Sequence, residues 1–201
     1  MTTAKPATLL LATTILPAIV GCGFDDWKIK LTRMELTAVN DEGVEENYFT
    51  RFQRASYRRG PAGLVELVLE AQHPSEVDPK QTITQLVYIK SYWTPIPGRT
   101  YMEATQINAR VQYAMLTPPT GVRYDGSTFV SYKMKKRSGE LKGRLESGNM
   151  SPKYRMGNAT EPFGPARFEG TFRARENPRH VVEVLQILES QFTETIAQHS
   201  P

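Results

Sequence analysis

Basic side chains are denser than average in two segments of this sequence, at Arg51, Arg54, Arg58 and Arg59 and again at Lys133, Lys135, Lys136, Arg137, Lys142 and Arg144. If the second segment shares one face of a sheet, it would attract an anionic surface. A long predicted loop that includes Lys153, Tyr154 and Arg155 could contact a ligand or partner. We predict binding at Lys135, Arg137, Lys142, Arg144, Lys153, Tyr154 and Arg155. The alternative is an ordinary solvated strand face, because Glu140 and Glu146 interleave with the bases of the second segment.

No catalytic constellation is visible in the sequence. It holds no nucleophile elbow, P-loop or dinucleotide fingerprint. One carboxylate, Glu103, interrupts an otherwise apolar or neutral strand face, so it could be a buried acid with a raised pKa. Glycoside-type hydrolysis needs two carboxyl groups roughly 5 to 10 Å apart. A carboxylate-dependent hydrolase or carbohydrate-active domain, using Glu103 and an unidentified second acid, is therefore the alternative function.

Metal-ligating residues are equally sparse. The histidines His73, His180 and His199 are isolated from one another, so the sequence predicts no metal site and no cofactor. Four acids, Asp41, Glu42, Glu45 and Glu46, surround a predicted turn. Calcium favours such oxygen-rich turns, but the spacing here matches no calcium loop. We interpret this segment as a charged hairpin tip.

The only cysteine, Cys22, directly follows an apolar stretch near the N-terminus. Lys5 precedes that stretch, which runs from Leu9 to Val20 and is too short to span a bilayer, so it is typical of a cleavable export signal. The last four residues, Ile19-Val20-Gly21-Cys22, resemble the lipobox of bacterial lipoproteins. The resemblance implies cleavage before Cys22 and diacylglycerol on its sulfur. The alternative is an ordinary signal peptide cleaved nearby, which would leave Cys22 as a free thiol.

The lipoprotein resemblance implies where the chain resides and what it contacts. We expect a signal peptide at residues 1–21, a lipidated tether at 22–26 and one domain at 27–201. Acyl chains would hold that domain on the periplasmic face of a membrane or at the cell surface. Gly23 is not the aspartate that retains some lipoproteins at the inner membrane, which favours the outer membrane. An envelope protein or an anionic envelope polymer is the expected partner, and nucleic acid is not.

Charge and cysteine content agree with a single exported domain. Removing Lys5 with the signal leaves 24 basic residues against 21 acids, a formal charge near +3. This excess is mild. With no second cysteine to pair, no disulfide is available, so stability must come from a hydrophobic core.

Alternation with a period of two residues recurs through the chain and predicts an antiparallel all-β domain. In the segment from Glu140 to Ser147, one strand face carries Leu141, Gly143 and Leu145. In the segment from Arg167 to Arg175, one face carries Phe168, Gly170, Phe172 and Ala174. The central glycines leave room for a large side chain, for which Trp27 and Trp93 are candidates. We predict a β-sandwich of about eight strands with one helix packed on it.

Further strands are predicted by the same alternation. Residues 101–115 are predicted to form one long strand, or two strands joined at a bend near Glu103 to Thr105. Segments 64–69 and 83–93 are apolar on both faces in places, which indicates a central position in the sheet. Residues 47–59 fit a helix or a strand, with strand preferred. Asp125-Gly126 predicts a tight turn before a strand at 127–134, and residues 148–165 are predicted to form a long loop.

The C-terminus predicts a helix at about 178–198. Asn177 can cap it and Pro178 suits its first position. Val181, Val184, Leu185, Leu188 and Phe192 recur at helical spacing and would pack on the sheet. Together these patterns lead to one hypothesis: a lipid-anchored envelope protein with a β-sandwich that binds a partner or has a structural role, without catalysis.

Overall fold

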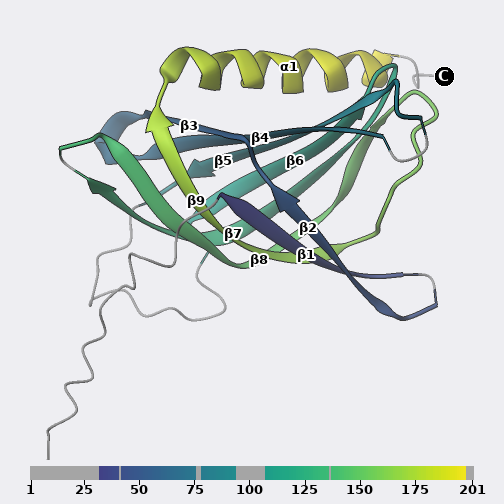
Figure 1. Cartoon of the computed structure of the whole chain (residues 1–201), viewed down its shortest axis with the longest axis horizontal. Helices are drawn as coiled ribbons and strands as arrows, with labels where there is room; N and C mark the ends of the chain where they lie inside the picture. The colour runs from purple at the N-terminus through teal and green to yellow at the C-terminus, as the bar shows by residue number, and fades with distance from the viewer. Residues whose placement is uncertain (1–31, 41, 76–77, 94–106, 136, 198–201) are drawn as a thin grey trace, which may run out of the picture.

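Nine strands form one strongly curved sheet with a single long helix on its outside (Figure 1). The computed structural model describes residues 32–40, 42–75, 78–93, 107–135 and 137–197. The strands are β1 (Arg33–Val39), β2 (Glu45–Arg51), β3 (Arg54–Arg59), β4 (Val65–Pro74), β5 (Thr82–Ser91), β6 (Ala109–Thr117), β7 (Thr120–Lys135), β8 (Glu140–Met156) and β9 (Ala166–Glu176). A short 3-10 helix, η1, spans Pro61–Gly63, and α1 spans Pro178–Ala197. Cys22, the tether, Trp27, Glu103 and His199 lie outside the described residues.

The sheet closes on itself, so the predicted sandwich is wrong. Seven strands follow one another in the order β9, β3, β4, β5, β6, β7, β8, and β8 pairs with β9 again. Closure depends on a short parallel contact in which Ser56 and Tyr57 of β3 pair with Arg175 and Glu176 of β9. The result is a seven-stranded barrel. Alternation of inward and outward residues is the same in a sandwich and in a barrel, which is why the strand pattern did not separate them.

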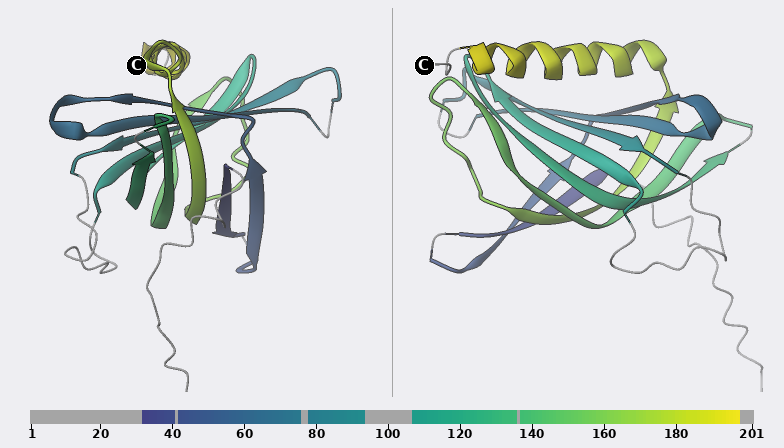
Figure 2. Two further views of the ribbon diagram at one scale, coloured as in Figure 1. Left: turned by 60° about the vertical axis from the view of Figure 1, so that its left-hand side comes forward. Right: turned by 180° about the vertical axis from the view of Figure 1, so that it is seen from behind.

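The β1–β2 hairpin adds two strands outside this ring. Along its first half, β9 pairs with β1, and only its last residues reach β3. Residues 47–59, for which strand was preferred, form β2 and β3, with a break at Phe52 and Gln53. The hairpin and α1 lie on opposite sides of the barrel (Figures 1 and 2).

The barrel interior is packed with side chains from all nine strands. Its largest fully buried residues include Tyr57, Tyr113, Tyr124 and Phe172. Phe163, from the segment after β8, stacks on Tyr124 with ring centroids 4.5 Å apart, and the Tyr124 hydroxyl donates to the Phe163 carbonyl at 2.8 Å. A small barrel filled in this way has a close-packed core of its own.

A second apolar cluster lies outside the barrel, under α1. The helix contributes its predicted stripe, and the strands contribute outward residues of β4, β5 and β6: Val68, Leu86, Tyr88, Ala114 and Leu116. This cover explains why β4 and β5 are apolar on both faces. The Asn177 side chain accepts from the His180 backbone N–H at 3.1 Å, which confirms the predicted cap. Among the described residues, no helix combines the length and apolar character that crossing a bilayer requires.

Two predicted breaks in the sheet are wrong. Asp125 and Gly126 lie inside β7, where Gly126 pairs with Met150. A Cβ on Gly126 would lie 2.1 Å from the Asn149 carbonyl oxygen, so this glycine allows close approach of two strands and forms no turn. Residues 148–165 are not one loop either, because β8 continues through to Met156.

Candidate functional site

The basic residues predicted to bind lie in two groups at opposite ends of β8. Lys142 and Arg144 follow the β7–β8 turn, whereas Lys153, Tyr154 and Arg155 lie near the other end of the strand. The 11 residues from Lys142 to Lys153 correspond to about 36 Å of strand. The structure therefore brings together the first group and leaves the second apart.

The first group lies on the outer face of the barrel because its strand neighbours are buried inside. Leu141 and Leu145 belong to the core, so Lys142 and Arg144, between them in the alternation, face outwards. Lys142 lies directly opposite Lys133 on β7 and opposite Arg173 on β9. Three cations from three strands thus form one row across the sheet.

Carboxylates offset only part of this concentration of charge. Glu140 accepts a hydrogen bond from Arg173 Nε, and Lys135 Nζ lies 3.8 Å from its other oxygen. The hydrogen bond from Arg173 and the charges of Arg173, Lys142 and Lys135 lower the pKa of Glu140. We use the name basic surface for Lys133, Lys135, Arg137, Lys142, Arg144 and Arg173, among which Lys142 is only 8% exposed. These cations outnumber the carboxylates beside them, Glu140 and Glu146, so the surface carries a net positive charge.

Exposed aromatic and aliphatic side chains lie just after β5 and just before β6. Tyr92, Trp93 and Ile107 are 54%, 37% and 51% exposed. Trp93 contacts Phe129 edge-on at 6.0 Å between ring centroids, and Phe129 lies opposite Glu146 on β8. Trp93 therefore lies outside the barrel. The space beside Gly143 that Trp93 was expected to fill is occupied by Phe172.

One side chain ties this aromatic segment to the strands. Asn108 donates from Nδ2 to the Val130 carbonyl at 2.8 Å and accepts from the Val130 N–H at 2.6 Å. The same amide group donates to the Trp93 carbonyl at 3.3 Å, and the Tyr92 N–H donates to the Asn108 carbonyl at 2.7 Å. Asn108 is fully buried, so it fixes Tyr92 and Trp93 relative to β7.

The described chain begins beside the basic surface. Thr32 Oγ1 donates to the Arg173 carbonyl at 3.3 Å and accepts from the Arg173 N–H at 3.1 Å. Residue 32 follows Cys22 by ten positions in the sequence. Neither Lys133 nor Arg173 was among the predicted binding residues. Only the strand register shows that β9 lies beside β8 at this point.

The second group of predicted binding residues takes part in packing. Arg123 lies 3.9 Å above the Tyr154 ring and 5.6 Å from the Phe192 ring of α1, and it donates to Asp125 at 3.1 Å. Arg155 donates to Glu161 at 2.7 Å, while Lys153 is exposed. Ligand binding by Lys153, Tyr154 and Arg155 stays a prediction.

A row of carboxylates lies next to the basic surface on the same outer face. Glu35 of β1 lies opposite Glu169 of β9, and Glu146 follows on β8 at a bulge where Ser147 has φ +51°. Burial raises the pKa of Glu146, an effect that the charge of Arg144 partly offsets. Glu146 Oε2 is buried and accepts no hydrogen bond from any residue in the described part of the chain. Glu146 therefore binds a proton more tightly than an ordinary glutamate does.

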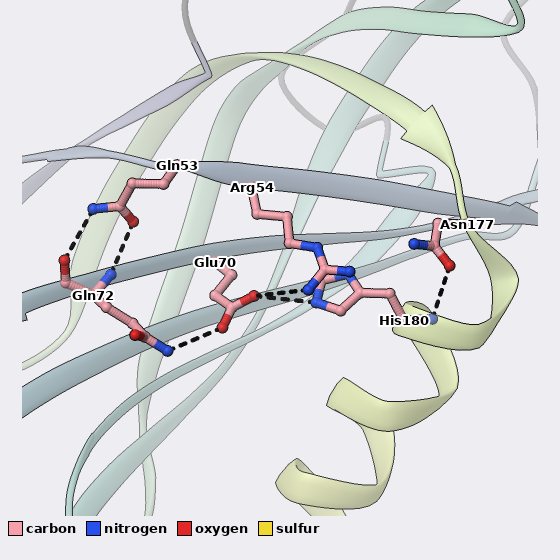
Figure 3. Close-up of polar contacts among 6 residues, drawn as sticks. All are labelled: Gln53, Arg54, Glu70, Gln72, Asn177 and His180. Atoms are coloured by element: carbon pink, nitrogen blue, oxygen red, sulfur yellow. Dashed lines mark hydrogen bonds and ion pairs between the residues drawn. The ribbon is translucent and has the colours of Figure 1, made fainter.

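A separate polar group joins α1 to the barrel (Figure 3). His180 Nε2 lies 3.1 Å from Glu70 Oε2, and Arg54 Nη1 lies 4.0 Å from the same oxygen. His180 is 4% exposed and lies at one end of a groove of about 340 Å³ between the helix and β4–β6. The described residues near His180 include no nucleophile in hydrogen-bond contact with it. This arrangement is that of an interior contact that fixes the helix.

Neither a metal site nor the proposed acid pair emerges from the geometry. Within the described ranges, no three His, Cys, Asp or Glu side chains lie close enough to hold a metal ion. The acidic turn is bonded internally: Asn40 Oδ1 accepts from the Glu42 and Val44 N–H groups, and Arg167 pairs with Glu45 at 2.8 Å. Glu103 lies outside the described residues, so the hydrolase alternative stays untested.

Comparison with known proteins adds no relative. No family model matches this chain, and searches of curated proteins and of solved structures give no match.

Proposed function

We propose that this chain is a lipid-anchored envelope protein whose barrel is a non-catalytic binding domain held against an anionic membrane surface. The acyl chains on Cys22 would supply the anchor, and the basic surface would contact phospholipid headgroups. One observation supports this proposal above all: Thr32, where the described chain begins, is hydrogen-bonded to Arg173 in the row of cations. The route to Cys22 therefore starts beside the basic surface.

The energetics of the proposed contact are favourable. Juxtamembrane basic residues contribute about 1 kcal/mol each near an anionic surface, so the exposed members of the basic surface could supply several kcal/mol. A single acyl chain binds only marginally and a second signal makes the attachment durable. Tyr92 and Trp93 carry the amphipathic rings that suit a headgroup region.

The packed interior supports binding on the outside of the barrel. Barrels that carry small molecules keep a cavity within, whereas this barrel is filled by tyrosine, phenylalanine and aliphatic side chains. An envelope protein or an anionic envelope polymer remains a second occupant for the same surface. We propose the outer membrane as the location on the identity of Gly23 alone.

Intact-mass analysis of protein from its native host tests the anchor. The expected mass is that of the chain from Cys22 onward plus a diacylglycerol and usually a fatty acid. An unprocessed leader or a bare Cys22 thiol would contradict the proposal.

Vesicle flotation tests the surface separately from the anchor. A Cys22→Ser chain starting at residue 22 should bind vesicles of anionic lipid, lose binding at high salt, and bind zwitterionic vesicles poorly. Lys133→Gln, Lys135→Gln and Arg137→Gln together should weaken binding about 100-fold, from about 1 kcal/mol per charge. A matched triple variant elsewhere, Lys80→Gln, Arg167→Gln and Arg179→Gln, should retain binding. Equal losses in both variants would mean that no localised surface exists.

A further inference from the structure

The outer edge of β2 is an unpaired strand edge. β2 pairs with β1 on one side, and no strand among the described residues pairs with its other side. Two backbone hydrogen bonds show which residues of this segment direct their N–H and C=O groups towards β1. The Asn40 N–H donates to the Val44 carbonyl, and the Phe52 N–H donates to the Thr32 carbonyl. Antiparallel pairing alternates, so even-numbered residues of β2 bond to β1. The backbone groups of Glu45, Asn47, Phe49 and Arg51 therefore point outwards.

Apolar side chains are exposed on this hairpin. Val39, Val44 and Phe49 are 52%, 53% and 51% exposed. The guanidinium groups of Arg33 and Arg51 lie 6.0 Å and 5.6 Å from the Phe49 ring centroid. An exposed strand edge with apolar side chains is a template for another strand.

We propose that β2 binds the β2 strand of a second copy of this chain, antiparallel, about a two-fold axis through Tyr48. In a symmetric antiparallel pair, the residue numbers of two facing residues add up to the same value at every position along the strands. Facing residues also project to the same side of a sheet, so that sum must be even. Among the even sums, only 96 pairs all seven residues of β2, and it places Tyr48 on the axis.

This register is also the one that matches the charges. Glu45 faces Arg51 of the partner subunit, and the same pair recurs by symmetry at the other end. Asn47 faces Phe49 of the partner subunit, and the outward backbone groups of both strands form about eight hydrogen bonds. A shift by two residues either way loses both charge pairs, and a shift by four towards the hairpin tip sets Glu46 against its own copy.

The symmetry has a consequence for orientation. A two-fold axis perpendicular to the β1–β2 sheet leaves the outer faces of the two copies on the same side. Both basic surfaces then face one direction, although the dimer does not depend on the proposed membrane contact. A pair of seven-residue strands is a small interface, so association in solution should be weak. Confinement of both copies to one surface would raise their effective concentration.

Disulfide trapping of the full chain tests the axis. Facing residues in a non-hydrogen-bonded pair have Cα atoms about 4.5 Å apart, which suits a disulfide. Tyr48→Cys should therefore give a covalent homodimer on mild oxidation. Glu35→Cys, one strand away from the axis, should not, and neither should the parent chain. A homodimer of the Glu35→Cys variant as strong as that of Tyr48→Cys, or an adduct of the Tyr48→Cys variant with a different protein alone, would overturn the proposal.

Charge reversal tests the register without touching Tyr48. Sedimentation of the detergent-solubilised full chain should show a concentration-dependent dimer. Glu45→Arg or Arg51→Glu should weaken it about tenfold or more, because each creates like-charge pairs at both ends. The double variant should restore it. Glu45 also pairs with Arg167 within its own chain, so Arg167→Gln is the control for losing that pair and should leave the dimer unchanged. Asn47→Pro, which removes an outward N–H only, should abolish it. A chain that stays monomeric up to about 1 mM, or a double variant no better than the singles, would overturn the proposal.

Discussion

Two glycines of β8 lie directly against phenylalanine rings of β9. A Cβ on Gly143 would lie 2.4 Å from the Phe172 ring and 2.3 Å from the Ser131 carbonyl oxygen. A Cβ on Gly148 would lie 2.3 Å from the Phe168 ring. In each case the ring of the facing residue occupies the space that the glycine leaves.

Gly143→Ala should therefore destabilise the barrel. The methyl group meets a backbone oxygen and a fully packed ring, and overpacking of this kind costs about 1 to 3 kcal/mol. Chemical denaturation monitored by circular dichroism measures the change. Gly60→Ala is the matched control, since its nearest contact would be an ordinary 3.7 Å to Leu64, and it should change stability by less than about 0.5 kcal/mol. Equal stability of the two variants would contradict this account.

Glu146→Gln should stabilise the protein at neutral pH by up to about 1 kcal/mol. The pKa of Glu146 is raised from 4.5 by burial, so the folded state binds a proton more tightly than the unfolded state. Stability then falls as the pH rises from about 4.5 through the raised pKa. The glutamine variant removes that loss, and its stability should depend less on pH in this window. Thermal unfolding at several pH values measures the stability and its pH dependence in both proteins. A steeper pH dependence in the Glu146→Gln variant would contradict the assignment of a raised pKa to Glu146.

At the scale of elements, β2 and β3 show how one chain segment pairs in two different parts of the sheet. β3 pairs with β4, but β2 departs towards β1 at Gln53. There the side chain replaces the missing strand: Gln53 Nε2 donates to the Gln72 carbonyl and Gln53 Oε1 accepts from the Gln72 N–H, both at 2.9 Å (Figure 3). The carboxamide continues the ladder where the backbone leaves it.

Gln53→Ala should loosen this edge of β4 without unfolding the barrel. Amide hydrogen exchange at Gln72 should accelerate, and the global stability should fall by only about 0.5 to 1.5 kcal/mol, the net contribution of ordinary hydrogen bonds. Gln53→Glu keeps the acceptor and loses the donor, so it should protect the Gln72 amide to an intermediate degree. Unchanged exchange at Gln72 in the alanine variant would rule out this role.

The strands and the helix also show which parts of the fold follow from the sequence. Alternation correctly placed Leu141 and Leu145 inside, and the helical stripe and Asn177 cap predicted α1. The prediction of a turn was wrong at Gly126, where the glycine instead allows two strands to approach each other closely. The alternation of apolar and polar residues could not predict barrel closure, because closure depends on which strands flank β9. The same holds for the basic surface: Lys142 and Arg144 were predicted, but Arg173 joins them only through strand register.

At the scale of the molecule, the barrel depends on α1 to cover one wall. Val181, Val184, Leu188 and Phe192 are nearly fully buried against Val68, Leu86 and Leu116. Burial of each such side chain contributes about 1.5 to 3 kcal/mol, so the four together approach the stability of a whole domain.

A chain that ends at Asn177 should accordingly lose cooperative folding. The exposed wall should bind a hydrophobic dye and aggregate, and thermal unfolding should show no sharp transition. Val182→Gln is the control, because Val182 is 37% exposed on the solvent side of the helix and should be tolerated. A truncated chain with the melting temperature of the parent would refute the dependence.

The two-residue contact that seals the ring joins positions 119 apart in sequence, Ser56 to Arg175 and Tyr57 to Glu176. Strand β9 is also the neighbour that both β1 and β8 require. A growing polypeptide therefore cannot complete this architecture until β9 has left the ribosome. Until then the nascent strands β3 to β8 lack the neighbour that closes the ring, and their unpaired edges are open to chaperones and to aggregation.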